Sequence, residues 1–314
     1  DDATDELTFN KRVSVALVTG SNQGIGFAIV EELLKREVKY VYVTSRNEQR
    51  GQDAVNKLKA KGLNPLFHQL EVTDAESVKK CAAYLKSKHG GLDILINNAG
   101  VIVEDWEKTT YEDAVRVITT NYYAILTIQE HFFPILNQNA RVINISSDCG
   151  HISNLKNKDW IARLTKKDLK KDDVDAFVNW FLDSVKNGTL KNEDFFQTEL
   201  LAYRISKVAL CALTVVQQNE IDRNISVNSL HPGFVQTSMT NGTGPFTMEQ
   251  ASKAPAYLAL DVDQSVKGQY FWYDKEAKDW RNPDLPLYCD FNVTKQYLGK
   301  YNFHRIKFFK SFST

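Results

Sequence analysis

Short apolar runs alternate with longer amphipathic stretches along most of the chain. Ile25, Ile29 and Leu33 recur at four-residue spacing, which predicts one buried face of a helix between the first two runs. Another helix is expected to begin after Asp74. Alternation of strands and helices is typical of a parallel sheet covered on both faces. The apolar runs predict seven strands, at residues 13–19, 39–44, 65–72, 92–97, 140–146, 225–230 and 268–273.

Two segments interrupt the alternation. Residues 151–198 hold no predicted strand, only a charged helical pattern in which Val174 and Val185 bound an apolar stripe. Thr165 and Asp168 have the spacing of a capping box, which predicts a helix start there. Residues 281–314 form a tail in which basic and aromatic side chains are interleaved. We expect the aromatic side chains to pack on the domain, with membrane or nucleic-acid binding as the alternatives.

Composition excludes several classes of protein. The 314 residues include 39 basic and 39 acidic side chains, for a net charge of zero, with 43% hydrophobic and 25% charged residues. These values are typical of globular proteins, so we expect no nucleic-acid binding. No apolar run reaches the roughly 18 residues that cross a bilayer, and no linker divides the chain, so residues 1–314 are predicted to form one domain without a membrane span.

The cysteines and histidines indicate which metal sites and which cellular compartment to expect. The four cysteines lie far apart without a Cys-x-x-Cys pair, and the six histidines lack metal-binding spacing. The first residues are acidic, whereas a secretory signal begins with basic residues. We therefore expect a cytoplasmic protein without a metal site.

A glycine-rich loop lies where the first predicted strand turns into the first helix. Glycines there allow a tight turn and let backbone N–H groups approach a pyrophosphate, which the helix N-terminus also attracts. A plain strand–helix turn is the alternative. The spacing is Gly-x-x-x-Gly-x-Gly, and the candidate cofactor-binding residues are Gly20, Asn22, Gln23, Gly24, Ile25 and Gly26.

The end of the second strand bears on the choice of cofactor. Sites that prefer NAD place an acidic residue there, which binds the ribose 2′-hydroxyl. Here the position holds Ser45 and Arg46, with Arg50 one turn further on. Because guanidinium groups pair with a 2′-phosphate, Arg46 and Arg50 predict NADP(H); two solvated surface arginines are the alternative.

A tyrosine and a lysine share one face of a predicted helix. Tyr203 and Lys207 are four residues apart. A tyrosine of normal pKa, about 10, is a poor acid–base group near neutral pH. A neighbouring ammonium lowers that pKa, so the pair is a candidate for proton transfer.

Five motifs in order resemble the short-chain dehydrogenase/reductase family, above all its monomeric NADPH-dependent carbonyl reductases. They are the glycine loop, Asn-Asn-Ala-Gly at 97–100, Ile-Ser-Ser at 145–147, Tyr-x-x-x-Lys at 203–207, and Pro-Gly at 232–233 with Thr237. The resemblance covers residues 12–280. It implies a Rossmann-type, doubly wound parallel sheet of seven strands in the order 3-2-1-4-5-6-7.

The resemblance also implies a catalytic tetrad. Tyr203 would donate the proton to the carbonyl oxygen, and Ser147, rather than Ser146, would position that oxygen. Lys207 would hold the nicotinamide ribose and tune Tyr203, while Asn121 would connect Lys207 to a water-borne proton supply. Further cofactor contacts implied by the family are Asn98, Glu71, Val72, Pro232, Gly233, Val235 and Thr237. Substrate contacts are Ser147, Cys149, Tyr203 and Phe234.

Some positions depart from the family pattern. Gln23 stands where carbonyl reductases often have a lysine for the 2′-phosphate. Glu71 replaces the aspartate that contacts adenine, and its extra methylene shifts its reach. His231 replaces a cysteine that some of these enzymes carry.

The resulting prediction is an NADPH-dependent reductase of ketones, aldehydes or quinones. The alternatives are an NADP-linked alcohol dehydrogenase working in the oxidative direction and a non-catalytic NADP(H)-sensing protein. In similar carbonyl reductases, the helical insertion, here 151–198, covers the surface through which relatives dimerise. We therefore expect a monomer; an intermolecular interface formed by the apolar stripe is the alternative.

Overall fold

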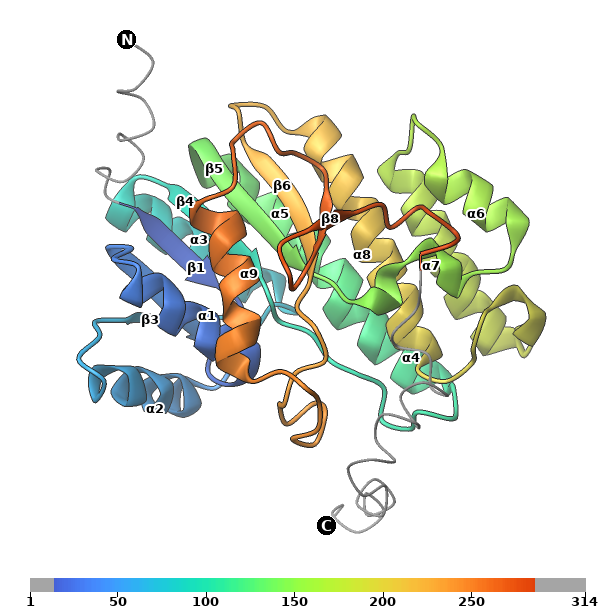
Figure 1. Cartoon of the computed structure of the whole chain (residues 1–314), viewed down its shortest axis with the longest axis horizontal. Coiled ribbons are helices and arrows are strands. Elements are labelled where there is room, and N and C mark those ends of the chain that lie inside the picture. The colour runs from blue at the N-terminus through green and yellow to red at the C-terminus, as the bar shows by residue number, and fades with distance from the viewer. Residues whose placement is uncertain (1–13, 286–314) are drawn as a thin grey trace.

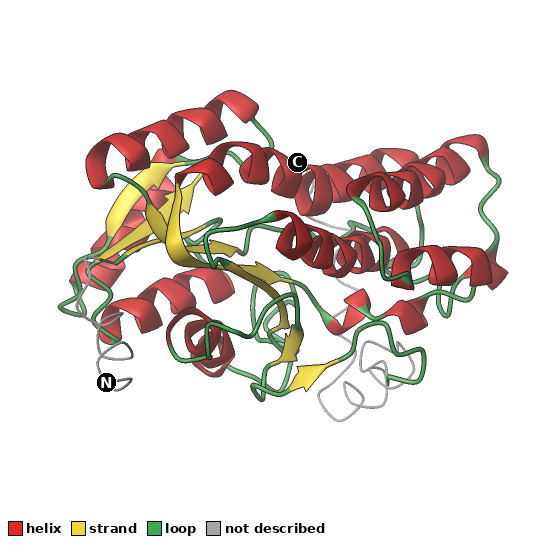
Figure 2. Cartoon of the chain, turned by 90° about the horizontal axis from the view of Figure 1, so that it is seen from above, coloured by secondary structure: helices red, strands yellow, loops and turns green. Residues whose placement is uncertain are grey.

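The computed structural model describes residues 14–285 and shows a central sheet with helices on both faces (Figures 1 and 2). The strands are β1 (Val15–Val18), β2 (Tyr40–Ser45), β3 (Leu66–Gln69), β4 (Leu92–Asn97), β5 (Leu136–Ile145), β6 (Ser226–His231), β7 (Tyr270–Trp272) and β8 (Ala277–Lys278). The helices are α1 (Gly24–Lys35), α2 (Glu48–Lys59), α3 (Ala75–His89), α4 (Tyr111–Ile118), α5 (Ala124–Phe132), α6 (Lys158–Thr165), α7 (Lys171–Asn187), α8 (Leu201–Glu220) and α9 (Met248–Leu260).

The strands pair in the order β3-β2-β1-β4-β5-β6-β7-β8. The first seven are parallel and confirm the predicted order. The predicted number of seven is wrong, because β8 adds an eighth strand, antiparallel to β7. This strand has only two residues, Ala277 and Lys278, so it lacks the apolar run on which the prediction relied.

Several element boundaries differ from the sequence prediction, and two of these differences have a clear cause. β5 begins at Leu136 rather than at residue 140. The apolar pattern does not reveal this earlier start because polar residues occupy positions 137–139. Thr165 does not cap a helix with Asp168, since it is the last residue of α6 and its hydroxyl donates to the Ile161 carbonyl. α7 begins later, where the Asp173 carboxylate accepts a hydrogen bond from the Lys170 N–H.

Both faces of the sheet are buried, as parallel strands require. Ala16 and Val18 of β1 point into a core with α1, α2 and α9, while Val15 and Leu17 point into a core with α3 and α5. Within residues 14–285, every helix is too short or too polar to cross a membrane.

The segment 151–198 contains α6 and α7, which lie beside α8 at the far side from α1 and α2 (Figure 1). The apolar stripe of α7 is buried in the same core as residues of α4 and α8. Four side chains of this stripe have no exposed surface: Val174, Phe177, Val178 and Phe181. The tail beyond residue 285 lies outside the described residues.

Candidate active site

The candidate site lies at the carboxyl ends of the central parallel strands. β1 is followed by the glycine loop, β4 by Asn98, β5 by Ser146 and Ser147, and β6 by Pro232. The strand order reverses between β1 and β4, and ligands of doubly wound sheets bind at such a point. The topology therefore brings four sequence motifs to one edge.

The glycine loop is shaped by close backbone contacts. Gly20 has a φ of +58°, which favours glycine. A Cβ on Gly26 would lie 2.4 Å from Asn98 Nδ2 and 2.8 Å from the Gly20 carbonyl oxygen, so no larger residue fits there. Asn98 Nδ2 donates to the carbonyls of Thr19 and Gly20, at 3.1 Å each. The predicted cofactor residue Asn98 thus fastens the loop to the end of β4.

The amino end of α1 is open to an anion. Its N-cap residue, Gln23, makes no side-chain capping hydrogen bond. The helix therefore keeps backbone N–H groups available, and the helix dipole attracts phosphate at this end. A Cβ on Gly24 would lie 3.9 Å from Thr237 Cγ2, so the loop after β6 faces the glycine loop. These features fit the pyrophosphate of a dinucleotide.

Arg46 and Arg50 lie beside this loop, at the start of α2. Asn47 caps the helix by accepting from the Arg50 N–H at 2.9 Å. Both arginine side chains are exposed, and neither guanidinium forms an ion pair with the residues at 14–285. The two cations are thus accessible to a 2′-phosphate at the end of β2.

Tyr203 and Lys207 lie one turn apart near the start of α8. Lys207 Nζ is 5.5 Å from the centroid of the Tyr203 ring and donates to the Ile145 carbonyl at 3.0 Å. Burial lowers the pKa of Lys207 to about 8. The structure therefore places a cation with a depressed pKa against the tyrosine that the sequence singles out.

Ser147 follows β5 and is buried near these groups. Its Oγ donates to Asp148 Oδ1 at 3.1 Å and accepts from the Cys149 N–H at 3.1 Å. The neighbouring Ser146 points elsewhere, with its Oγ 3.1 Å from Cys211 Sγ and 3.4 Å from the Lys207 carbonyl oxygen, which places it against α8.

Asn121 lies in a π-helical turn, Thr119–Tyr123, between α4 and α5. Its side chain bonds both backbone groups of Val101, at 2.9 Å each, and donates to Ser206 Oγ at 3.0 Å. A Cβ on Gly100 would lie 3.3 Å from Asn121 Oδ1 and 3.8 Å from Lys207 Nζ. Asn121 and Lys207 thus flank Gly100. The hydrogen bonds of the Asn121 side chain fix the loop after β4 at Val101.

The other predicted cofactor and substrate residues follow β3, β5 and β6, and they differ in burial. The Glu71 carboxylate accepts from the Thr73 N–H and hydroxyl, at 3.2 and 2.8 Å, and Val72 is buried. Cys149 is buried beside Ser147. After β6, Gly233 has a φ of +91° and Val235 is buried, while Phe234 is half-buried.

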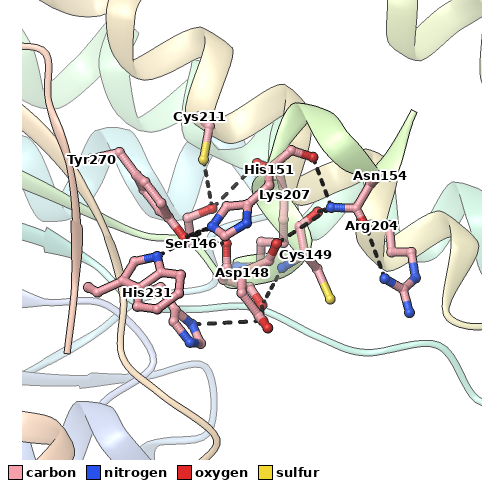
Figure 3. Close-up of polar contacts among 12 residues, drawn as sticks. Ser146, Asp148, Cys149, His151, Asn154, Arg204, Lys207, Cys211, His231 and Tyr270 are labelled. Atoms are coloured by element: carbon pink, nitrogen blue, oxygen red, sulfur yellow. Dashed lines mark hydrogen bonds and ion pairs between the residues drawn. The ribbon is translucent and has the colours of Figure 1, made fainter. Parts of the chain in front are cut away.

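Sequence reasoning missed two residues that position the site. Arg204 is 1% exposed, and its Nη1 donates to Asn154 Oδ1 at 2.8 Å. Asn154 Nδ2 in turn donates to the carbonyls of Cys149 and His151, at 2.9 and 2.8 Å (Figure 3). These hydrogen bonds connect the loop after Ser147 to α8, the helix that carries Tyr203. The available signal was Arg204 itself, because Arg204 and Lys207 are the only charged residues in the mostly apolar stretch 201–216.

A buried polar cluster also surrounds Asp148 and His151 in the loop after β5 (Figure 3). The Tyr270 hydroxyl donates to the Ser147 carbonyl at 3.1 Å and is 2.8 Å from His151 Nε2. His231 Nδ1 is 3.9 Å from Asp148 Oδ1. β6 and β7 thus supply side chains that support the loop after β5.

Comparison with known proteins points in one direction. The sequence model described as short chain dehydrogenase matches residues 14–159. Carbonyl reductase (NADPH) 1 of Bos taurus is 32% identical over 276 residues, or 85% of this chain and 98% of that protein. Carbonyl reductase (NADPH) 3 of Mus musculus is 34% identical over 275 residues, with the same two coverages. The structure of salutaridine reductase from Papaver somniferum has a TM-score of 0.76 at 31% identity, covering 82% of this chain and 99% of that chain.

Proposed function

Since the chain belongs to the short-chain dehydrogenase/reductase family, we propose that it reduces small ketones, aldehydes or quinones to alcohols with NADPH and Tyr203 as proton donor. Its relatives are named as NADPH carbonyl reductases, and they support an NADPH-dependent oxidoreductase. The observation that carries the proposal is the contact of Lys207 with the Tyr203 ring, in a chain whose glycine loop fits a dinucleotide.

The chain's own residues divide the chemistry between them. NADPH, when bound, supplies the hydride. The Tyr203 hydroxyl donates a proton to the carbonyl oxygen as negative charge develops there, and the Lys207 ammonium stabilises the phenolate that remains. Ser147 holds the same oxygen in place. Asn98 and the glycine loop orient the dinucleotide, and Asn121 holds the loop at Val101 beside Lys207.

The selection of NADPH over NADH is assigned to Arg46 and Arg50. Both are exposed, Arg46 directly after β2 and Arg50 in the first turn of α2, and no acidic residue stands within the segment 44–47. We expect Arg46→Ala with Arg50→Ala to raise the KM for NADPH by about 10- to 100-fold, because charge-assisted hydrogen bonds to phosphate are lost. The KM for NADH should stay unchanged. Parallel titrations of both cofactors measure this, and an equal loss for both would refute the assignment.

The activity itself is tested with a panel of carbonyl compounds. NADPH absorbance is followed with menadione, aromatic ketones and aldehydes, using NADH in parallel. We expect turnover with NADPH for at least one class, and little with NADH. Absence of turnover across the whole panel would contradict the proposed function.

Two broader properties accompany the proposal. A monomer is supported by the apolar stripe of α7, which is buried within the chain against α4 and α8. A cytoplasmic location is supported by Cys81 and Cys211, which are buried free thiols and fit a reducing compartment.

A further inference from the structure

The loop between β6 and α9 is closed on itself at Phe246. The Phe246 N–H donates to the Phe234 carbonyl at 3.3 Å, and the Gln236 N–H donates to the Phe246 carbonyl at 2.9 Å. Inside the loop, Thr240 Oγ1 accepts from the Thr237 N–H at 3.0 Å. The loop is therefore one bonded unit, and its position depends on where Phe246 is attached.

The ring of Phe246 attaches this loop to the sheet. Its centroid is 4.5 Å from that of the Tyr273 ring, at an interplanar angle of 45°. Tyr273 comes directly after β7, and its ring lies 5.9 Å from that of His231, the last residue of β6. A Cβ on Gly233 would lie 2.8 Å from Phe246 Cδ2 and 3.4 Å from Tyr273 Cδ1, so both rings pack on its backbone. The Phe246–Tyr273 pair thus joins the loop to the carboxyl ends of β6 and β7.

The same loop faces the glycine loop. A Cβ on Gly24 would lie 3.9 Å from Thr237 Cγ2. Val235 is 2% exposed and pairs with Phe246 in an isolated parallel bridge. Val235 and Thr237 are the residues of this loop to which the family resemblance assigns cofactor contacts. The attachment of Phe246 therefore determines where these two residues stand.

We propose that the Phe246–Tyr273 pair positions the dinucleotide by fixing the loop after β6 against the sheet, so that loss of either ring weakens NADPH binding. The inference goes beyond the proposed function and rests on its assignment of the dinucleotide to this edge of the sheet. Both residues act through Val235 and Thr237 and are positioning residues.

Titration with NADPH tests the proposal. Dissociation constants are measured for the wild type, Phe246→Ala, Tyr273→Ala and the double variant. Each single variant should bind NADPH about five- to ten-fold more weakly, the scale of a packed aromatic pair. Because the two rings form one contact, the double variant should lose no more than about two-fold beyond the weaker single variant. An unchanged dissociation constant in either single variant, or losses that multiply in the double variant, would overturn the proposal.

A second cycle separates positioning from a general structural role. Since the pair acts in part through Thr237, Phe246→Ala should weaken NADPH binding by less than about three-fold in a Thr237→Ala background. A merely structural ring would cause the same loss in both backgrounds, and that result would contradict the inference.

Tyr40→Ala is a matched control. The Tyr40 ring is half-buried and lies 4.7 Å from that of His89 at an interplanar angle of 44°, nearly the geometry of the Phe246–Tyr273 pair. Tyr40 is the first residue of β2 and lies at the opposite edge of the sheet. Its removal should leave the dissociation constant of NADPH unchanged, and an equal loss there would refute a specific role for the pair.

Proteolysis gives a readout that needs neither cofactor nor turnover. Thermolysin cleaves before apolar residues, and Met239 in the loop is 37% exposed. Without NADPH, cleavage before Met239 should be about five- to ten-fold faster in Phe246→Ala and Tyr273→Ala than in the wild type or Tyr40→Ala, because the released loop opens more often.

An unchanged rate of cleavage overturns the proposal. If cleavage and NADPH binding change as expected but the wild type reduces no carbonyl compound, only the proposed function is contradicted. If Phe246→Ala does not fold, Phe246→Leu removes the ring with a smaller loss of volume and is held to the same criteria.

Discussion

At the scale of single residues, the site contains groups whose burial works against stability. The Lys207 ammonium is 5% exposed and donates to the Ile145 carbonyl, and burial lowers its pKa to about 8. A lysine in the unfolded chain has a pKa of about 10.4. The folded state therefore binds a proton less readily than the unfolded state between these two values, and the charged form destabilises the fold below pH 8.

Lys207→Met is predicted to stabilise the protein while removing activity. Since one pKa unit corresponds to about 1.4 kcal/mol, the gain in unfolding free energy at pH 7 is about 3 kcal/mol. The gain should shrink as the pH rises from 8 towards 10.5, because the wild-type lysine then becomes neutral in the folded state. Urea denaturation at pH 7 and pH 9.5 measures it.

The exposed Lys57 offers a matched control. Lys57→Met should change the free energy of unfolding by less than about 0.5 kcal/mol at either pH. A Lys207→Met variant less stable than the wild type at pH 7 would show that the buried ammonium is compensated by its surroundings.

The same scale shows why some site residues escape a sequence analysis. Tyr203, Lys207 and the glycine loop are recognisable because their chemistry depends on local spacing along one helix or turn. Asn154 gains its role only from its contact with Arg204, which depends on how the loop after β5 packs on α8. No spacing in the chain encodes that contact.

At the scale of elements, α7 is held by its apolar stripe rather than by its sequence of charges. Phe177 has no exposed surface, and its ring lies 5.5 Å from that of Trp160 on α6. The stripe was predictable because helical spacing alone reveals a buried face. The start of α7 was not, because the Thr165–Asp168 spacing resembles a cap, whereas Thr165 completes α6.

Phe177→Ala is expected to lower the free energy of unfolding by about 3 to 5 kcal/mol, because it leaves a cavity in the core that α7 shares with α4 and α8. Phe196 lies in the same segment with 39% of its surface exposed, so Phe196→Ala should cost less than about 1 kcal/mol. Urea denaturation measures the free energy of unfolding of both variants. Equal losses would contradict the burial of the α7 stripe against the catalytic core.

At the scale of the whole molecule, the parallel sheet follows from the repeated alternation of strand and helix. Seven strands were predictable from their apolar runs, and their order in the sheet from the family resemblance. β8 was not predictable because a two-residue edge strand buries little. This sheet brings Ser147 from β5 and the glycine loop from β1 to one edge, where α8 adds Tyr203. The hydroxyl to which we assign the proton transfer therefore lies where these elements meet.

The most direct test of the account is the reduction of a carbonyl substrate by Tyr203→Phe, with NADPH binding measured on the same sample. We predict that kcat falls by about 10²- to 10⁴-fold, the usual contribution of a general acid, while the dissociation constant of NADPH stays within about three-fold. Tyr257→Phe on α9, which loses only a remote hydroxyl, should keep wild-type turnover. A Tyr203→Phe enzyme that retains more than about a tenth of wild-type kcat would contradict the central claim.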